Sequence, residues 1–229
     1  MKKFQDKTLS RIAVISAIVS LAMSSSTLSA SADSGAPRPN PLASDDRQSV
    51  SSYLSEYGAS EQQISKIISN LEKGILPDAA KGGSPSATKE VKANGVTQTI
   101  STYPDGSMSV IEVSDPSAKT NGNLGTRSAS VTSCKKVAAH TYQNCYAQAK
   151  TPVITWSFRF NFGPKTITKH WNGAYASRGA VVSNPHFVWM SSTVEKYGGQ
   201  LTYGGVYSGS SYLKVGVTPD HATASLVSA

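Results

Sequence analysis

The sequence predicts an α+β fold, with a small N-terminal helix pair plus β-meander followed by an all-β antiparallel sandwich or barrel. Apolar residues recur at helical spacing between residues 50 and 71. From residue 90 onward the period changes to two, and turn signals interrupt it at short intervals. Many short strands at such spacing are typical of antiparallel sandwiches and barrels.

The first 32 residues have the pattern of a cleavable signal peptide. Basic residues up to Arg11 precede an apolar run at 12–23, and Ala30-Ser31-Ala32 fits an A-x-A cleavage site. A membrane anchor is the weaker interpretation, because this run spans about 18 Å as a helix and a bilayer core is about 30 Å thick. We therefore expect a secreted, extracellular protein that starts near Asp33 and has no transmembrane segment in its mature form.

The N-terminal part of the mature chain is expected to be a disordered leader at 33–47 and a helix-and-meander module at 48–113. The leader is rich in proline and poor in apolar residues. Ser60 and Gln63 form a capping-box pattern between two helical stripes, which stop at Gly58 and Gly74. The stripes consist of Val50, Tyr53, Leu54 and Tyr57, and of Ile64, Ile67, Ile68 and Leu71.

Three strands are expected after the helices, at 90–93, 96–103 and 107–113. Asn94-Gly95 is a strong signal for a two-residue hairpin, and Pro104-Asp105-Gly106 turns the chain again. Residues 114–130 are rich in Ser, Gly, Asn and Thr, so we expect a linker there.

Residues 131–229 are expected to form a basic antiparallel β domain. Strand-like segments lie at 153–162, 165–171, 174–178, 187–196, 200–207 and 211–217. The turns expected between them are Gly163-Pro164, Asn172-Gly173, Asn184-Pro185, Gly198-Gly199 and Gly209-Ser210.

The strand at 153–162 carries large apolar side chains at every second position. A row of flat rings on a sheet could stack on sugars, but strict period-two alternation is what the buried face of a central strand requires. We therefore assign this row to the core: Ile154, Trp156, Phe158, Phe160 and Phe162.

The two cysteines, Cys134 and Cys145, are expected to form a disulfide, because export places them in an oxidising compartment. A catalytic thiol assisted by a histidine such as His140 is the weaker alternative, since it needs a free cysteine of low pKa.

Charge divides unevenly along the mature chain. Residues 33–127 hold nine Lys/Arg and eleven Asp/Glu, whereas residues 128–229 hold nine Lys/Arg and only Glu195 and Asp220, a net charge of +7. Such a field favours polyanionic partners, with ordinary solubilising charge as the alternative. For an exported protein we expect an anionic cell-wall polymer, a glycan or an anionic membrane surface as partner, and not nucleic acid.

Seven residues are candidates for ligand contact in the basic domain. Four are aromatic and stand near turns, and three are cations that a sheet could gather on one face. Sugar stacking and charge neutralisation are the respective roles, and packing at the rim of the core is the alternative for the aromatic residues. The candidates are Trp171, Tyr175, Tyr203, Tyr207, Lys165, Lys169 and Arg178.

No catalytic residue, metal site or cofactor is predicted. The four histidines show no metal-ligand spacing and no neighbouring carboxylate in the sequence, so each is taken as an isolated surface residue. Glycoside hydrolysis needs two carboxyl groups about 5 to 10 Å apart, and the basic domain offers only Glu195 and Asp220. No G-x-S-x-G motif marks a serine hydrolase.

Residues 55–113 resemble a group of secreted proteins from Gram-positive bacteria, chiefly actinobacteria, that have no assigned activity. The resemblance rests on the helix start at 57–63, the helix end at 71–74 and the hairpin at 103–110. It implies a bacterial exported protein with a shared N-terminal module and a variable β-rich C-terminal part, and it brings no catalytic residues with it.

These observations favour a secreted, non-enzymatic binding protein whose basic β domain binds an anionic polymer or glycan. The alternative is a toxin-like effector in which the N-terminal module is a pro-region that masks the basic domain. An extracellular hydrolase is the third hypothesis.

Overall fold

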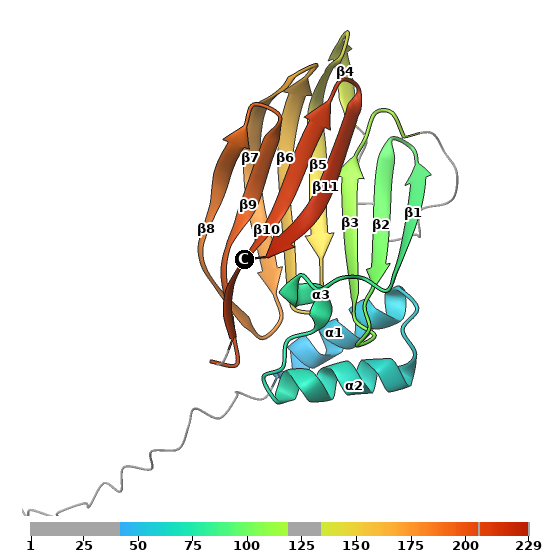
Figure 1. Ribbon diagram of the computed structural model, residues 1–229, viewed down its shortest axis with the longest axis vertical. Helices are drawn as coiled ribbons and strands as arrows, with labels where there is room; N and C mark the ends of the chain where they lie inside the picture. Colours follow the sequence, from blue (N-terminus) through green and yellow to red (C-terminus); the bar gives the residue numbers. More distant parts are fainter. Residues whose placement is uncertain (1–41, 119–133, 206, 229) are drawn as a thin grey trace, which may run out of the picture. The chain divides into compact units, whose positions relative to one another are not determined.

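The structure is a computed structural model that describes residues 42–118, 134–205 and 207–228. The expected signal peptide and most of the expected leader and linker lie outside the described residues. The fold class is confirmed: three helices are followed by antiparallel strands in two sheets (Figure 1). The elements are α1 (Ser44–Glu56), α2 (Glu61–Glu72), α3 (Asp78–Lys81), β1 (Ala87–Ala93), β2 (Val96–Thr102), β3 (Met108–Ser114), β4 (Lys135–Ala138), β5 (Thr141–Lys150), β6 (Ile154–Gly163), β7 (Thr166–Ser177), β8 (Ala180–Ser191), β9 (Val194–Tyr203), β10 (Tyr207–Thr218) and β11 (His221–Ser228).

The two expected helices form, and their apolar stripes are buried. Ser60 and Gln63 close the capping box at the start of α2, which supplies partners for backbone N–H groups that the helix itself leaves unpaired. Helix α1 begins at Ser44, so the expected leader is wrong for its last residues. The short helix α3 was not anticipated; its first N–H groups donate to the side chains of Asp105 and Ser107 in the β2–β3 turn.

The seven strands of sheet A run in the order β1-β2-β3-β5-β6-β7, with β4 paired to the other end of β5. Sheet B has the order β11-β10-β9-β8. The two-residue connection at Arg178 and Gly179 joins β7 of sheet A to β8 of sheet B, so the chain passes from one layer to the other at this edge. The structure is therefore a sandwich.

The expected turns in the basic domain are mostly wrong. Only Gly163-Pro164 lies where a strand ends, with Gly163 the last residue of β6 and Pro164 in the turn, whereas the other four dipeptides lie inside β7, β8, β9 and β10. Asn172-Gly173 and Asn184-Pro185 are β-bulges, in which two residues oppose one on the neighbouring strand. The strands β4, β5 and β11 were not anticipated, because their many polar and small residues gave no clear period.

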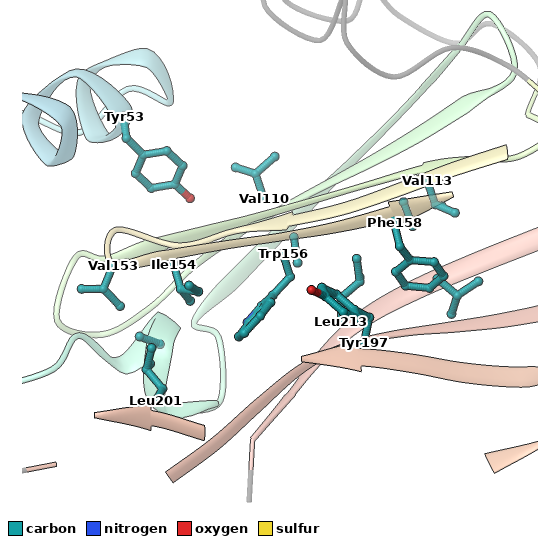
Figure 2. Packing of buried hydrophobic residues seen from close by; sticks show 14 of the residues in the cluster. Tyr53, Val110, Val113, Val153, Ile154, Trp156, Phe158, Tyr197, Leu201 and Leu213 are labelled. Atoms are coloured by element: carbon teal, nitrogen blue, oxygen red, sulfur yellow. The ribbon is translucent and has the colours of Figure 1, made fainter. Parts of the chain in front are cut away.

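The core lies between the two sheets and is built around the expected aromatic row. Trp156, Phe158, Phe160 and Phe162 of β6 are fully buried, so the assignment of this row to the core is confirmed. From sheet B, Leu213 and Tyr197 lie beside Trp156 and Phe158 in the core (Figure 2). The Trp156 indole also donates a hydrogen bond to Ser211 at 3.0 Å.

The N-terminal elements and the basic β domain share one sheet and one core, where the sequence suggested two modules. Strand β3 pairs with β5 through Val110 to Val113. Tyr53 of α1 donates to the carbonyl oxygens of Met108 and Lys150, and so joins the start of β3 to the end of β5. This arrangement fixes the faces of β5, β6 and β7 that carry the candidate site.

Candidate functional site

The outer face of sheet A, over β5, β6 and β7, gathers aromatic and basic side chains. Because side chains alternate along a strand, the burial of Cys145 and Ala147 directs Tyr146 of β5 outward. In the same way, the burial of Phe158 and Phe160 directs Arg159 of β6 outward.

Three of these side chains form one row across the strands. Tyr146 is directly opposite Arg159, and Arg159 is directly opposite Trp171 of β7. The guanidinium carbon of Arg159 lies 5.4 Å from the centre of the Tyr146 ring, within the range of a cation–π contact. We call Tyr146, Arg159 and Trp171 the outer-face row. Directly opposed side chains on a sheet are close neighbours, so the row is a continuous surface.

Lys169 adds a second cation to the outer-face row. Its ammonium lies 5.3 Å from the centre of the Trp171 ring, and its backbone is paired with Asn161 of β6. No carboxylate of the described residues forms an ion pair with Arg159 or Lys169. Both charges are therefore available to a bound anion.

Two bulges in β7 decide which candidates share a face. Trp171 and Tyr175 would lie on the same face of a regular strand, but the bulge at Asn172-Gly173 shifts the alternation between them. Tyr175 consequently pairs with Trp156 and lies on the same side of the sheet as the indole, 5.7 Å from it, where the tyrosine stays 44% exposed at the sheet edge. The second register shift lies between Ile167 and Lys169, which pair with Phe162 and Asn161 of β6. Lys165 precedes β7 and lies in the turn, so it is not on a regular strand with Lys169 and the two need not share a face.

The remaining three candidates hold the fold together. Tyr203 is buried, and its hydroxyl donates to the carbonyl oxygen of Leu71 in α2 at 3.1 Å. Arg178 donates to Ser49 of α1 and to the carbonyl oxygen of Thr151. Tyr207 begins β10, where its ring packs over Gly209.

The cations of the basic domain do not gather on a single face. Lys196 and Lys214 are paired on the outer face of sheet B, where Lys196 lies 4.2 Å from the centre of the Tyr212 ring. Lys150 of β5 lies 3.4 Å from the buried carboxylate of Glu112. The outer-face row therefore holds only part of the basic charge, but it is where the cations meet both a tyrosine and a tryptophan.

Three of the four histidines pair with carboxylates, contrary to the expectation of isolated residues. The Nδ1 atoms of His140, His170 and His221 lie 2.6, 2.9 and 2.9 Å from oxygens of Asp220, Glu195 and Asp115. Each pair joins a residue of one sheet, or of a turn that adjoins it, to a residue of the other. Sequence reasoning missed these pairs because the partners are between 25 and 106 positions apart in the sequence.

The two carboxyl groups considered for glycoside hydrolysis lie in different environments. Burial raises the pKa of Glu195, and its charge and hydrogen-bond interactions with His170 oppose that effect. The hydrogen bond from Tyr142 is the main cause that lowers the pKa of Asp220, and His140 contributes in the same direction. Each carboxylate is thus engaged by its own histidine.

The expected disulfide is present. Cys134 and Cys145 are bonded, with their Cα atoms 4.4 Å apart, so the bridge ties the residue before β4 to β5. No group of three or more His, Cys, Asp or Glu side chains within 42–118, 134–205 and 207–228 could hold a metal ion. In the same part of the chain, no helix has the length and apolar character needed to span a membrane.

Comparison with known proteins adds one structural similarity. No family model matches the chain, and no curated protein does. The crystal structure of the hypothetical protein lmo2686 from Listeria monocytogenes EGD-e is 18% identical and covers 59% of this chain and 96% of its own, with a TM-score of 0.34. A similarity at that score carries no argument about fold or function.

Proposed function

We propose that this is a secreted, non-enzymatic binding protein that holds an acidic glycan or anionic cell-wall polymer on the outer-face row. The observation that carries the proposal is the direct cross-strand order Tyr146, Arg159, Trp171, with Lys169 beside the indole. The row combines flat apolar rings with two cations that have no carboxylate partner among the described residues.

This combination suits a polymer of charged sugar or polyol units. The C–H face of a sugar ring can lie on the Trp171 indole, while Arg159 can form two parallel hydrogen bonds to a carboxylate, sulfate or phosphate group. Lys169 adds a mobile ammonium that attracts the next charge along the polymer. The flat surface of a sheet fits an extended chain better than it fits a small compact ligand.

The disulfide and the expected signal peptide support secretion as part of the proposal. An anionic polymer of the cell surface is then the first polyanion that the exported protein meets. The pro-region alternative gains less support, because β3 pairs with β5 and helix α1 is hydrogen-bonded to both strands. A module that must leave its partner would be expected to share less of the core.

Salt dependence tests the proposal. We expect the affinity for lipoteichoic acid or polygalacturonate to fall steeply between about 50 and 200 mM salt, because each neutralised anion releases counterions. Arg159→Gln and Lys169→Gln should each reduce the slope of log affinity against log salt by about one. Trp171→Ala should weaken binding about five- to tenfold at both salt concentrations, since stacking depends little on ionic strength. Isothermal titration calorimetry measures all three effects.

Lys214→Gln on the outer face of sheet B is the matched control, because it removes the same charge from another face. This variant should keep most of the affinity for the polymer and most of the slope of log affinity against log salt. If Lys214→Gln weakens binding as much as Arg159→Gln does, the basic charge acts without a specific site and the proposal is wrong. Salt-insensitive binding that Trp171→Ala abolishes would instead indicate a neutral-glycan binder.

A further inference from the structure

A cavity of about 140 Å³ lies on the inner face of sheet A, between β1 to β3 and strand β11 of sheet B. Two cross-strand rows form one wall of the cavity. The first is Glu90, Thr99 and Ile111, and the second is Lys92, Thr97 and Val113. The opposite wall consists of His221, Ala222, Thr223 and Ala224.

Small residues on β11 leave this cavity open. Protein interiors are close-packed, and a gap beside Ile111 and Val113 is where a leucine or valine on β11 would be expected. The chain has Ala222 and Ala224 at these positions. A cavity lined by polar groups is suited to bound water or a ligand, whereas a purely apolar one stays dry.

His221 is held in a defined orientation at one end of the cavity. Its Nδ1 lies 2.9 Å from Asp115 Oδ2 and 2.9 Å from the Ser117 hydroxyl. Asp115 is fully buried and also accepts hydrogen bonds from Ser117 and Thr97. Because a carboxylate only accepts, Nδ1 carries a proton toward Asp115, and Nε2 is left as the ring atom that can hydrogen-bond to a ligand.

The other polar groups of the cavity balance in charge. The ammonium of Lys92 lies 3.0 Å from the carboxylate of Glu90, so the pair has no net charge. Thr99 and Thr223 contribute hydroxyls that can both donate and accept. Ile111, Val113 and Ala222 provide an apolar floor. The lining thus favours a neutral ligand that has many hydroxyl groups and an apolar face.

We infer that this cavity is a binding site for a single neutral sugar unit, with one of its hydroxyls hydrogen-bonded to His221 Nε2. The volume is below the about 300 Å³ at which pockets for larger ligands begin, which indicates one unit and not a chain. The cavity is on the face of sheet A opposite the outer-face row. It is therefore a second site, independent of the proposed polymer surface.

Titration of the exported protein with glucose and N-acetylglucosamine tests this inference, with glucuronate as a charged comparator. The His221 ring signals in NMR should shift saturably with a neutral sugar. Ala224→Met fills the cavity, and His221→Asn keeps a donor for Asp115 but removes Nε2. His221→Asn should weaken binding about tenfold, the value of roughly one lost hydrogen bond. Ala224→Met should weaken it at least as much, because the methionine side chain occupies the space of the ligand.

Ala174→Met is the matched control, because Ala174 is an exposed alanine of β7 outside the cavity. It should bind the sugar normally, as should Trp171→Ala, which disables only the outer-face row. Thermal unfolding of each variant shows that the fold is intact. The inference is overturned if neither neutral sugar shifts His221, if Ala224→Met binds as well as the unaltered protein, or if only glucuronate binds.

Discussion

Single carboxyl groups join the two sheets of the sandwich, and Asp220 shows the physical basis. It lies in the turn between β10 and β11, accepts a hydrogen bond from Tyr142 of β5, and contacts His140 in the β4–β5 turn. The Tyr142 hydrogen bond is the main reason that the pKa of Asp220 is lowered from 3.8. Burial, together with the same hydrogen bond, raises the pKa of Tyr142 to about 12.

The sign of the resulting pH dependence follows from this lowered pKa. The folded state holds the ionised carboxylate more strongly than the unfolded state does, so this contribution is fully present above pH 3.8. It is lost as the pH falls through the lower, folded-state pKa. Tyr142→Phe removes the hydrogen bond and keeps the buried ring.

We expect Tyr142→Phe to be less stable than the unaltered protein at neutral pH and to lose less stability on acidification. Denaturant unfolding from neutral pH to below 3.8 measures the difference. Tyr207→Phe, which removes a tyrosine hydroxyl away from Asp220, should leave the acid dependence unchanged. An identical acid dependence in Tyr142→Phe and the unaltered protein would contradict the assignment.

Among the strands, three bulges share one local structure. At each, an asparagine with positive φ stands where two residues oppose one: Asn144, Asn172 and Asn184, with φ of 56°, 51° and 51°. Asparagine tolerates this backbone conformation better than most residues, which is also why it is common in turns. Because asparagine followed by glycine suits both turns and bulges, this pattern led to a correct prediction of the hairpin at Asn94-Gly95 and to a wrong prediction of a turn at Asn172-Gly173.

Gly173 is required at its bulge for space. A Cβ atom there would overlap the Tyr197 ring, which belongs to the core. We expect Gly173→Ala to destabilise the protein by about 1–3 kcal/mol, the usual cost of overpacking. It should also disturb the outer-face row, because the bulge sets the direction of Trp171.

Gly163→Ala is the control at the end of β6. A Cβ atom at Gly163 meets no atom of the described residues within 4 Å, so the expected change is within about 0.5 kcal/mol. Chemical denaturation of both variants compares the two glycines. Equal stability of Gly173→Ala and Gly163→Ala would mean that the bulge adapts and does not need glycine.

On the scale of the whole molecule, side chains distant in sequence attach the helices to the sandwich. The Tyr53 hydroxyl is hydrogen-bonded to the start of β3 and to the end of β5. Arg178 donates a hydrogen bond to Ser49 of α1, and Tyr203 donates one to the carbonyl oxygen of Leu71 near the end of α2. Val110 and Val113 of β3 belong to the same buried cluster as Trp156 and Leu213 (Figure 2). We therefore expect the described residues to unfold as one cooperative unit.

Cleavage of the chain tests this cooperativity. If a protease site is placed within 119–133 and cut, we expect the two pieces to elute together in size-exclusion chromatography until denaturant is added. The reason is that β3 and the helices remain paired with and packed on the second piece. Release of a folded C-terminal piece without denaturant would favour the pro-region alternative and contradict a single core.

The sequence by itself determined the local structure wherever the local signal was strong. Helices α1 and α2, the capping box, the first hairpin, the disulfide and the buried row of β6 all follow from patterns within about 12 residues. Local apolar periodicity and capping act through neighbouring residues, so they can be detected without knowledge of the fold. Of the candidate site, the sequence supplied Trp171 and Lys169.

Only the tertiary structure decided how these parts combine. The bulge at Asn172-Gly173 separates Trp171 from Tyr175, and strand pairing brings Tyr146 and Arg159 to Trp171. The partners of His170 and His221 come from other strands, at Glu195 and Asp115. Strand register and the contacts between sheets depend on packing across the core. That packing is the sum of many interactions between residues far apart in the chain, so no local pattern reveals it. For that reason the outer-face row and the cavity at His221 are properties of the folded molecule.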